Sequence, residues 1–172
     1  MIGSAMSKQD LLDELQDEYR SLLELVQEFG QDDFQKPGAA GAWTAQDVFG
    51  HLAFWNGEAK KAIALALRGE RPDPWLVDDD APINAREQAL RHSWPLPKVM
   101  DEFRRSVRAL TAEISAASET QLERESPHKA PDGSTPTKSS ERGANAAWVA
   151  GRAIEHLRSH GEAIDIWLHA EG

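Results

Sequence analysis

Two histidines near the C-terminal end of the sequence, His156 and His160, have a spacing that suits a metal site. They lie in the stretch 153–168, AIEHLRSHGEAIDIWL, whose apolar residues recur with the period of an α-helix. Residues four positions apart on a helix lie one above the other, about 6 Å apart along the axis, so both imidazoles can bind one ion. A second interpretation stays open, because histidines at this spacing are also common as ordinary residues of a helix core.

The helical period also indicates which way these histidines point. His156 and His160 share one arc of the helix with apolar residues, namely Val149, Ala153, Leu157, Ile164 and Trp167. The remaining arc is mostly polar and holds Arg152, Glu155, Arg158, Ser159, Glu162, Asp165 and a third local histidine, His169. We therefore expect His156 and His160 to face the protein interior and His169 to face solvent.

The composition of the 172-residue chain restricts its chemistry. The chain has no cysteine, so disulfides, thiolate metal sites and thiol nucleophiles are excluded, and a metal would have to bind His, Asp or Glu. A net charge of −10 argues against nucleic acid as a partner. No apolar run approaches the roughly 20 residues of a membrane span and no signal peptide is visible, so we expect a cytoplasmic protein without a membrane partner.

Four long segments show the periodicity of amphipathic helices. They cover residues 7–29, 44–68, 98–117 and 141–170, with a shorter helix at 83–92. The segments between them, 31–43, 69–82 and 118–140, are rich in loop-forming residues and contain no convincing strand. The sequence therefore predicts an all-α protein, a single domain over 7–170 built as an up-and-down-type four-helix bundle with long loops, after an N-terminal extension at 1–6.

The second of these helices has a clear start signal. Thr44 can cap the first amide groups, Asp47 favours the positive end of the helix, and Trp43 and Val48 match a hydrophobic staple. The apolar arc of this helix contains Val48, Leu52, Trp55, Ala59, Ala62 and Ala66. His51 lies on the edge of that arc, which makes it a third histidine expected to point inward.

Three stretches of the sequence resemble the DinB/YfiT-like superfamily of four-helix bundles. WTAQDVFGHLAFW resembles its W-[ST]-x-x-D-x-x-x-H-L pattern, and EHLRSHGEAIDIWL resembles its H-x-x-x-H segment. Between them, DDDAPINAREQA with Asn84 is similar to the acidic-then-Asn turn of the ClbS/DfsB-like branch, and the maleylpyruvate-isomerase-N-like branch is the other candidate. The resemblance spans residues 8–169.

This resemblance implies a metal site and a class of activity. Metal-binding members hold one divalent ion, commonly zinc or nickel, through one side chain of the second helix and two of the last, which carry over to His51, His156 and His160. Members include thiol-dependent S-transferases and isomerases that use bacillithiol, mycothiol or glutathione, and some relatives are hydrolases. We therefore expect a metal-dependent thiol S-transferase or hydrolase acting on a small electrophilic molecule, with a divalent metal and a low-molecular-weight thiol as candidate cofactors.

Two alternatives to an enzyme stay open. The first is a non-catalytic bundle that binds small molecules or confers resistance, with a structural metal or none. The second is a plain helical protein that dimerises and whose histidines are hydrogen-bonded core residues. Relatives often pair through bundle faces, so the resemblance also makes a homodimer a candidate assembly.

Four polar residues are weaker candidates for the site. Glu58 can act as a base beside the metal or be a surface carboxylate, and Arg152 can bind an anionic thiol or be an ordinary surface residue. Asn84 and Asp80 can border the pocket, or they can simply cap a turn or a helix.

The remaining candidates would surround the site. Trp55, Trp148 and Trp167 can form walls of the pocket or pack in the core. Glu155 and Asp47 are candidate hydrogen-bond partners for the second ring nitrogen of the ligand histidines. His128 is expected in an exposed loop.

Overall fold

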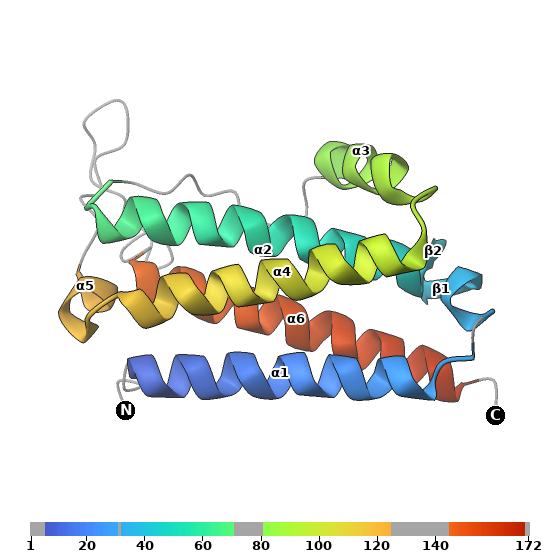
Figure 1. Cartoon of the computed structure of the whole chain (residues 1–172), viewed down its shortest axis with the longest axis horizontal. Helices are drawn as coiled ribbons and strands as arrows, with labels where there is room; N and C mark the ends of the chain where they lie inside the picture. The colour runs from blue at the N-terminus through green and yellow to red at the C-terminus, as the bar shows by residue number, and fades with distance from the viewer. Residues whose placement is uncertain (1–5, 31, 71–80, 125–144, 171–172) are drawn as a thin grey trace.

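Four long helices form the body of the protein in the computed structural model, which describes residues 6–30, 32–70, 81–124 and 145–170 (Figure 1). They are α1 (Lys8–Glu28), α2 (Ala45–Leu67), α4 (Leu96–Ala116) and α6 (Ala146–His169). The shorter elements are the 3₁₀-helix η1 (Asp33–Gln35), the strands β1 (Pro37–Ala40) and β2 (Trp43–Thr44), and the helices α3 (Ala81–Arg91) and α5 (Glu119–Glu123). The predicted all-α bundle is confirmed.

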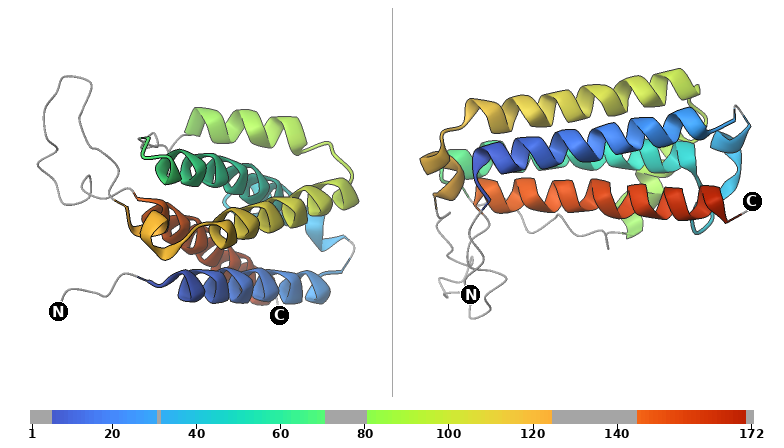
Figure 2. Two further views of the ribbon diagram at one scale, coloured as in Figure 1. Left: turned by 60° about the vertical axis from the view of Figure 1, so that its left-hand side comes forward. Right: turned by 90° about the horizontal axis from the view of Figure 1, so that it is seen from below.

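The direction of the helices differs from the up-and-down order expected. α1 and α6 run one way along the bundle, whereas α2 and α4 both run the other way (Figure 1). Side-chain contacts agree, because Gln46 at the start of α2 donates to the carbonyl of Trp94 just before α4, and Asn56 farther along α2 donates to Ser106 of α4. The shared direction of α2 and α4 follows from the position of α3. This helix runs back beside α2, so α4 begins at the same end of the bundle as α2 (Figure 2).

The core lies between the four long helices. The predicted apolar arc of α2 is confirmed, since Val48, Leu52, Trp55 and Ala59 are all buried. Phe49 of α2 meets Phe103 of α4 edge-on with ring centroids 5.2 Å apart. Burial of each large apolar side chain contributes about 1.5–3 kcal/mol, so this interface holds the bundle together. In the described part of the chain, no helix has both the length and the apolar character needed to cross a membrane.

Side-chain caps mark where the helices begin. Thr44 and Asp47 form a reciprocal capping box at the start of α2, which confirms the predicted start signal. Ser118 and Gln121 form a similar box at the start of α5. α5 therefore corrects the expectation of a loop over 118–140, whose residues from 125 onward lie outside the described part. α6 begins after its cap Asn145, and the predicted earlier start at 141 also lies outside the described residues.

A short hairpin replaces the plain loop expected over 31–43. β1 and β2 pair antiparallel, with Pro37 opposite Thr44 and Ala40 opposite Trp43. Gly38 and Gly41 have positive φ angles of 121° and 62°, a backbone region that glycine enters without steric strain. The hairpin leads directly into α2, so its geometry sets where the first turn of that helix lies.

Candidate metal centre

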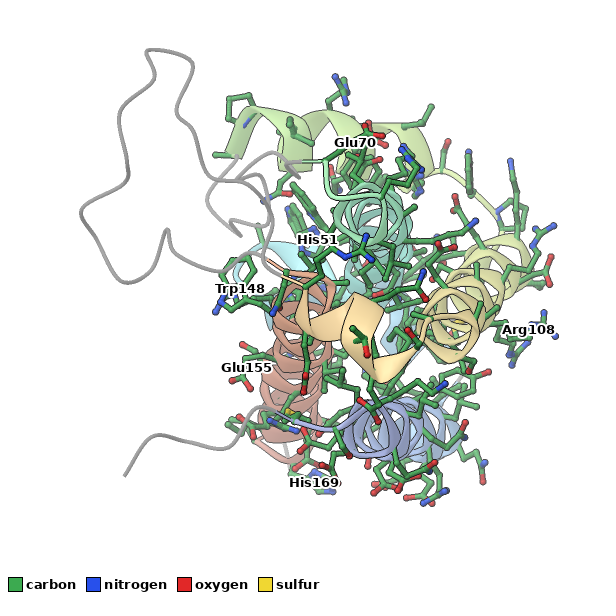
Figure 3. All side chains as sticks on the ribbon, turned by 90° about the vertical axis from the view of Figure 1, so that its left-hand side faces the viewer. His51, Glu70, Arg108, Trp148, Glu155 and His169 are labelled. Carbon is green, nitrogen blue, oxygen red and sulfur yellow. The ribbon has the colours of Figure 1, made fainter. Side chains whose placement is uncertain are left out.

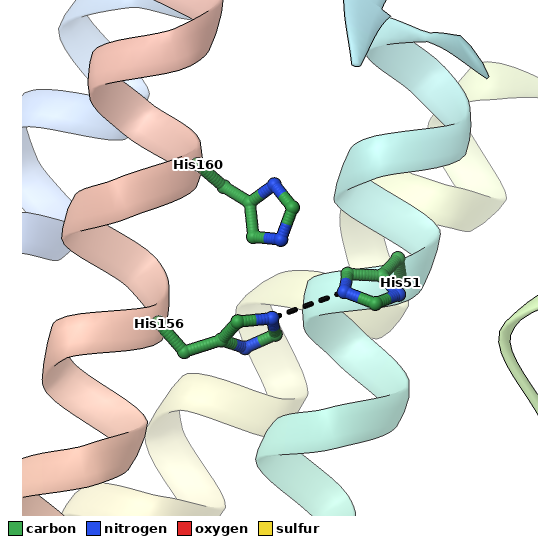
Figure 4. Close-up of side chains that lie close together, drawn as sticks. All are labelled: His51, His156 and His160. Carbon is green, nitrogen blue, oxygen red and sulfur yellow. Dashed lines mark hydrogen bonds between the residues drawn. The ribbon is translucent and has the colours of Figure 1, made fainter. Parts of the chain in front are cut away.

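Three histidines from two helices meet between α2 and α6 (Figure 4). His51 comes from α2, and His156 and His160 come from successive turns of α6. One ring nitrogen from each lies within 4.8 Å of the others, and the Nε2 atoms of His51 and His156 are 3.0 Å apart. The predicted inward orientation is confirmed, because His51 and His156 are buried, His160 is half-buried and His169 is exposed.

The arrangement of the three rings fits one divalent ion. Zinc–imidazole bonds of about 2.0–2.1 Å, at angles of about 90–110°, place two ligand nitrogens about 3.0–3.4 Å apart. The His51–His156 distance of 3.0 Å lies in that range, and the ring centroids are 4.9, 4.9 and 4.7 Å apart. Neutral imidazole is also a donor that suits zinc and nickel. Without an ion, the same contact requires one Nε2 to donate its proton to the other.

Two indole rings flank His51. Trp43 of β2 lies edge-on with its centroid 5.2 Å from that of His51, and Trp55, one turn farther along α2, lies edge-on at 6.3 Å. The Nε1 of Trp55 donates to the Oδ1 of Asn84 in α3 over 2.9 Å. Of the weaker candidates, Trp55 is therefore the one shown beside a ligand histidine, and Asn84 binds Trp55 in turn. Apolar rings at such a site keep water away and strengthen the electrostatic interactions inside it.

The first turn of α2 is held by Asp47, one turn before His51. Its Oδ2 accepts hydrogen bonds from the backbone N–H and the hydroxyl of Thr44, and its Oδ1 lies 2.9 Å from the Nδ1 of His92. Burial raises the pKa of the Asp47 carboxyl, but the hydrogen bonds from Thr44 and His92 outweigh burial and hold the pKa below its ordinary value. Asp47 thus anchors the helix that carries His51.

The other predicted site residues have different neighbours. Glu58 forms an ion pair with Lys61 on its own helix, and Arg152 is exposed on the outer arc of α6. Glu155 is exposed too and pairs with Arg158. The structure leaves Asp80 and His128 outside the described residues.

The two remaining candidate tryptophans lie towards opposite ends of α6. Trp148, in the first turn, is 43% exposed (Figure 3). Trp167, in the last turn, lies against Phe29 with ring centroids 5.8 Å apart and against the backbone of Gly38. Trp167 therefore packs the end of the bundle, as the core-packing interpretation expected.

A separate groove of about 390 Å³ runs between α1 and α6. Its lining belongs to the outer arc of α6 and to α1, and includes Glu18, Glu24, Glu28, Arg158, Glu162 and Asp165. Arg158 bridges the two helices through ion pairs with Glu14 and Glu18, and these carboxylates raise the pKa of its guanidinium. The groove is thus an acidic surface feature that does not include the three histidines.

Sequence reasoning missed two contacts around the site. The first is the bond from His92 to Asp47, which joins residues 45 positions apart and leaves no local pattern in the sequence. The second is the contact of Trp43 with His51, since Trp43 was interpreted only as part of a hydrophobic staple. The hairpin that sets the position of Trp43 was not predicted, so the only available signal was its place immediately before the cap Thr44.

Comparison with known proteins identifies the family of the chain. The family model described as the DinB superfamily matches residues 14–164, a range that contains all three histidines. No curated protein and no solved structure matches the chain. Because the family model covers most of the sequence, the chain belongs to the DinB superfamily.

Proposed function

We propose that this protein is a metal-dependent enzyme that acts on a small electrophilic molecule, either as a thiol S-transferase or as a hydrolase. The observation that carries the proposal is the meeting of three imidazoles, from α2 and α6, within 4.8 Å. Three neutral protein ligands are typical of catalytic zinc sites, whereas structural sites usually have four. Zinc and nickel are the metals that best suit this donor set.

The residues at this site would have separate roles. When bound, the ion would supply a positive charge that lowers the pKa of a nucleophile beside it. His51, His156 and His160 would hold that charge in place, and the buried position of His51 and His156 keeps both rings from solvent. Trp43 and Trp55 would exclude water on the His51 side.

One observation favours a second candidate, a non-catalytic bundle with a structural ion. His51 and His156 are only 6% and 7% exposed, and their contact connects α2 to α6, so an ion between them would cross-link the two helices. The two candidates differ in whether a coordination position remains open to small molecules. Cobalt substitution separates them, because added thiol changes the visible spectrum of cobalt only at an open site.

Elemental analysis of protein purified without chelators tests the proposal first. We expect about one equivalent of zinc or nickel per chain, lost in the His156→Ala variant, because an ion left with two imidazoles binds weakly. The loaded protein should then accelerate the reaction of a thiol with a model electrophile such as 1-chloro-2,4-dinitrobenzene, or the hydrolysis of an activated ester. Absence of metal, even after zinc and nickel are added back, would overturn the metal-dependent enzyme and leave a metal-free binding bundle.

A further inference from the structure

The helix α3 is attached to the bundle in a different way from the other helices. Of the side chains of α3, all within the described part of the chain, Arg91 alone is buried, and Leu90 is 55% exposed. The neighbouring α4 instead buries a full apolar stripe that includes Val99, Phe103 and Val107. An element with few buried apolar contacts opens locally more readily than the core does.

Polar contacts hold α3 in place at both ends. Near its start, the Oδ1 of Asn84 accepts the hydrogen bond from Trp55. Just after its end, His92 binds Asp47, and Arg91 donates to the two carboxylate oxygens of Glu102 on α4 over 3.0 and 3.1 Å. These are directional contacts that water can replace once the helix moves away.

The position of His51 relative to these contacts connects α3 with the candidate metal centre. α3 lies over α2, on the side of α2 away from α1 (Figure 3). On α2, His51 is midway between Asp47 and Trp55, one helical turn from each. Trp55 binds Asn84 of α3, and Asp47 binds His92, the residue that follows α3. Trp55 contacts both α3 and the candidate metal centre, because its N–H donates to Asn84 while its ring lies beside His51.

We propose that α3 is a lid of the three-histidine site. While α3 is docked, Asn84 fixes the indole of Trp55 beside His51. When α3 undocks, Trp55 is released and the histidines become accessible to a small molecule. The inference rests on the proposed function only for the nature of that molecule, since the movement itself can be measured without metal or substrate.

The structure offers a way to lock the lid. A Cβ added at Gly50 of α2 would lie 3.5 Å from the Cβ of Arg91, and two cysteines in a disulfide have Cβ atoms about 3.5–4.5 Å apart. The chain has no cysteine of its own, so the Gly50→Cys/Arg91→Cys variant can form only this intramolecular bond. Oxidation ties α3 to α2. The reduced variant lacks the Arg91–Glu102 contact and is therefore freer than the wild type.

The readout is the rate at which diethyl pyrocarbonate modifies each histidine, followed by mass spectrometry on metal-free protein. We expect the rates at His51 and His156 to be at least roughly tenfold lower in the oxidised variant than in the reduced one, with the wild type between them. His169, whose side chain is 62% exposed, should react equally in all three and serves as an internal reference. Equal rates at His51 and His156 in the oxidised and reduced variants would overturn the lid.

A second pair of variants decides the matter if the cysteine variant does not fold. Asn84→Ala removes the acceptor that holds Trp55, whereas Asn84→Asp keeps an oxygen in the same place. We expect the alanine variant to expose His51 to the reagent faster than the wild type and the aspartate variant to behave like the wild type. Hydrogen exchange of the α4 amides should be equal in both variants, because a faster exchange there would mean general loosening and would contradict a local lid.

The outcomes for the lid and for the proposed function are distinguishable. Protection of the histidines by oxidation in a protein that never binds zinc or nickel would keep the lid and reject the metal-dependent enzyme. One equivalent of bound metal, together with equal modification rates in the oxidised and reduced cysteine variant, would keep the metal-dependent enzyme and reject the lid.

Discussion

The indole Nε1 of Trp167 occupies the space where a side chain on Gly38 would begin. A Cβ built on Gly38 would lie 2.5 Å from that nitrogen, closer than such atoms approach in real proteins. Gly38 belongs to the hairpin before α2, and Trp167 belongs to the last turn of α6. The absence of a side chain at position 38 therefore lets the hairpin rest on the helix that carries His156 and His160.

We expect Gly38→Ala to lower the free energy of unfolding by about 1–3 kcal/mol, because the new methyl group displaces Trp167 and the φ angle of 121° is unfavourable for alanine. Gly41→Ala is the matched control. Gly41 also has a positive φ, of 62°, but a Cβ there meets no atom within 4 Å. Urea denaturation of both variants measures the difference, and equal losses would contradict a role for the Trp167 contact.

The Asp47 carboxyl should make stability depend on pH in a defined direction. Its pKa in the folded protein lies below the ordinary value of 3.8, so its contribution is present above pH 3.8 and is lost as the pH falls through the folded pKa. We expect Asp47→Asn to be less stable than the wild type at pH 7 by about 1 kcal/mol. The difference should shrink below about pH 4, and urea denaturation from pH 7 to pH 3 checks this. A difference that stays constant over the whole range would contradict it.

Zinc should stabilise the folded protein through the three histidines. An ion that binds only the folded state raises the free energy of unfolding by about 2.7 kcal/mol at a free concentration 100-fold above its Kd. We expect thermal unfolding to move to higher temperature with zinc in the wild type and in His169→Ala, but much less in His160→Ala. His169 lies on the same helix and is exposed on the opposite arc, so it controls for unspecific histidine binding. An equal shift in all three proteins would place the zinc elsewhere.

The buried amide of Asn56 should reduce stability. Within the described part of the chain, its Oδ1 is buried without a hydrogen-bond donor, while its Nδ2 donates to Ser106. An unsatisfied buried acceptor costs about 1–3 kcal/mol, so Asn56→Leu should stabilise the protein by about 1 kcal/mol. Ser106 keeps its own bond to the carbonyl of Phe103 in that variant. Asn56→Ala leaves a cavity and should destabilise, and a leucine variant as unstable as the alanine variant would be the contrary result.

Local patterns in the sequence predicted the helices and the orientation of the histidines well. The capping signal at Thr44 and Asp47 and the apolar arcs of α2 and α6 depend on residues within a few turns of each other. The inward position of His156 and His160 followed from the same periodicity. The grouping of His51 with them required the family resemblance, because no local pattern connects residues of two distant helices.

Features that depend on tertiary contacts escaped prediction. The shared direction of α2 and α4 results from α3 lying back along α2, and the polar contacts of Asn84 and His92 that hold it there are long-range. α5 was missed for a different reason, because its cap Ser118 and its partner Gln121 stand in a stretch dominated by loop-forming residues. A short helix in such a stretch has too few residues for its periodicity to be visible.

The separation of 105 residues between His51 and His156 sets the order of events during synthesis. α2 leaves the ribosome long before α6 has been made. While α3, α4 and α5 emerge, His156 and His160 have therefore not yet been synthesised. All three imidazoles can surround an ion only after His160 has emerged and α6 has packed against α2. If the three histidines bind an ion as proposed, its binding would be a late step in the biogenesis of this protein and would require α6 to have packed against α2.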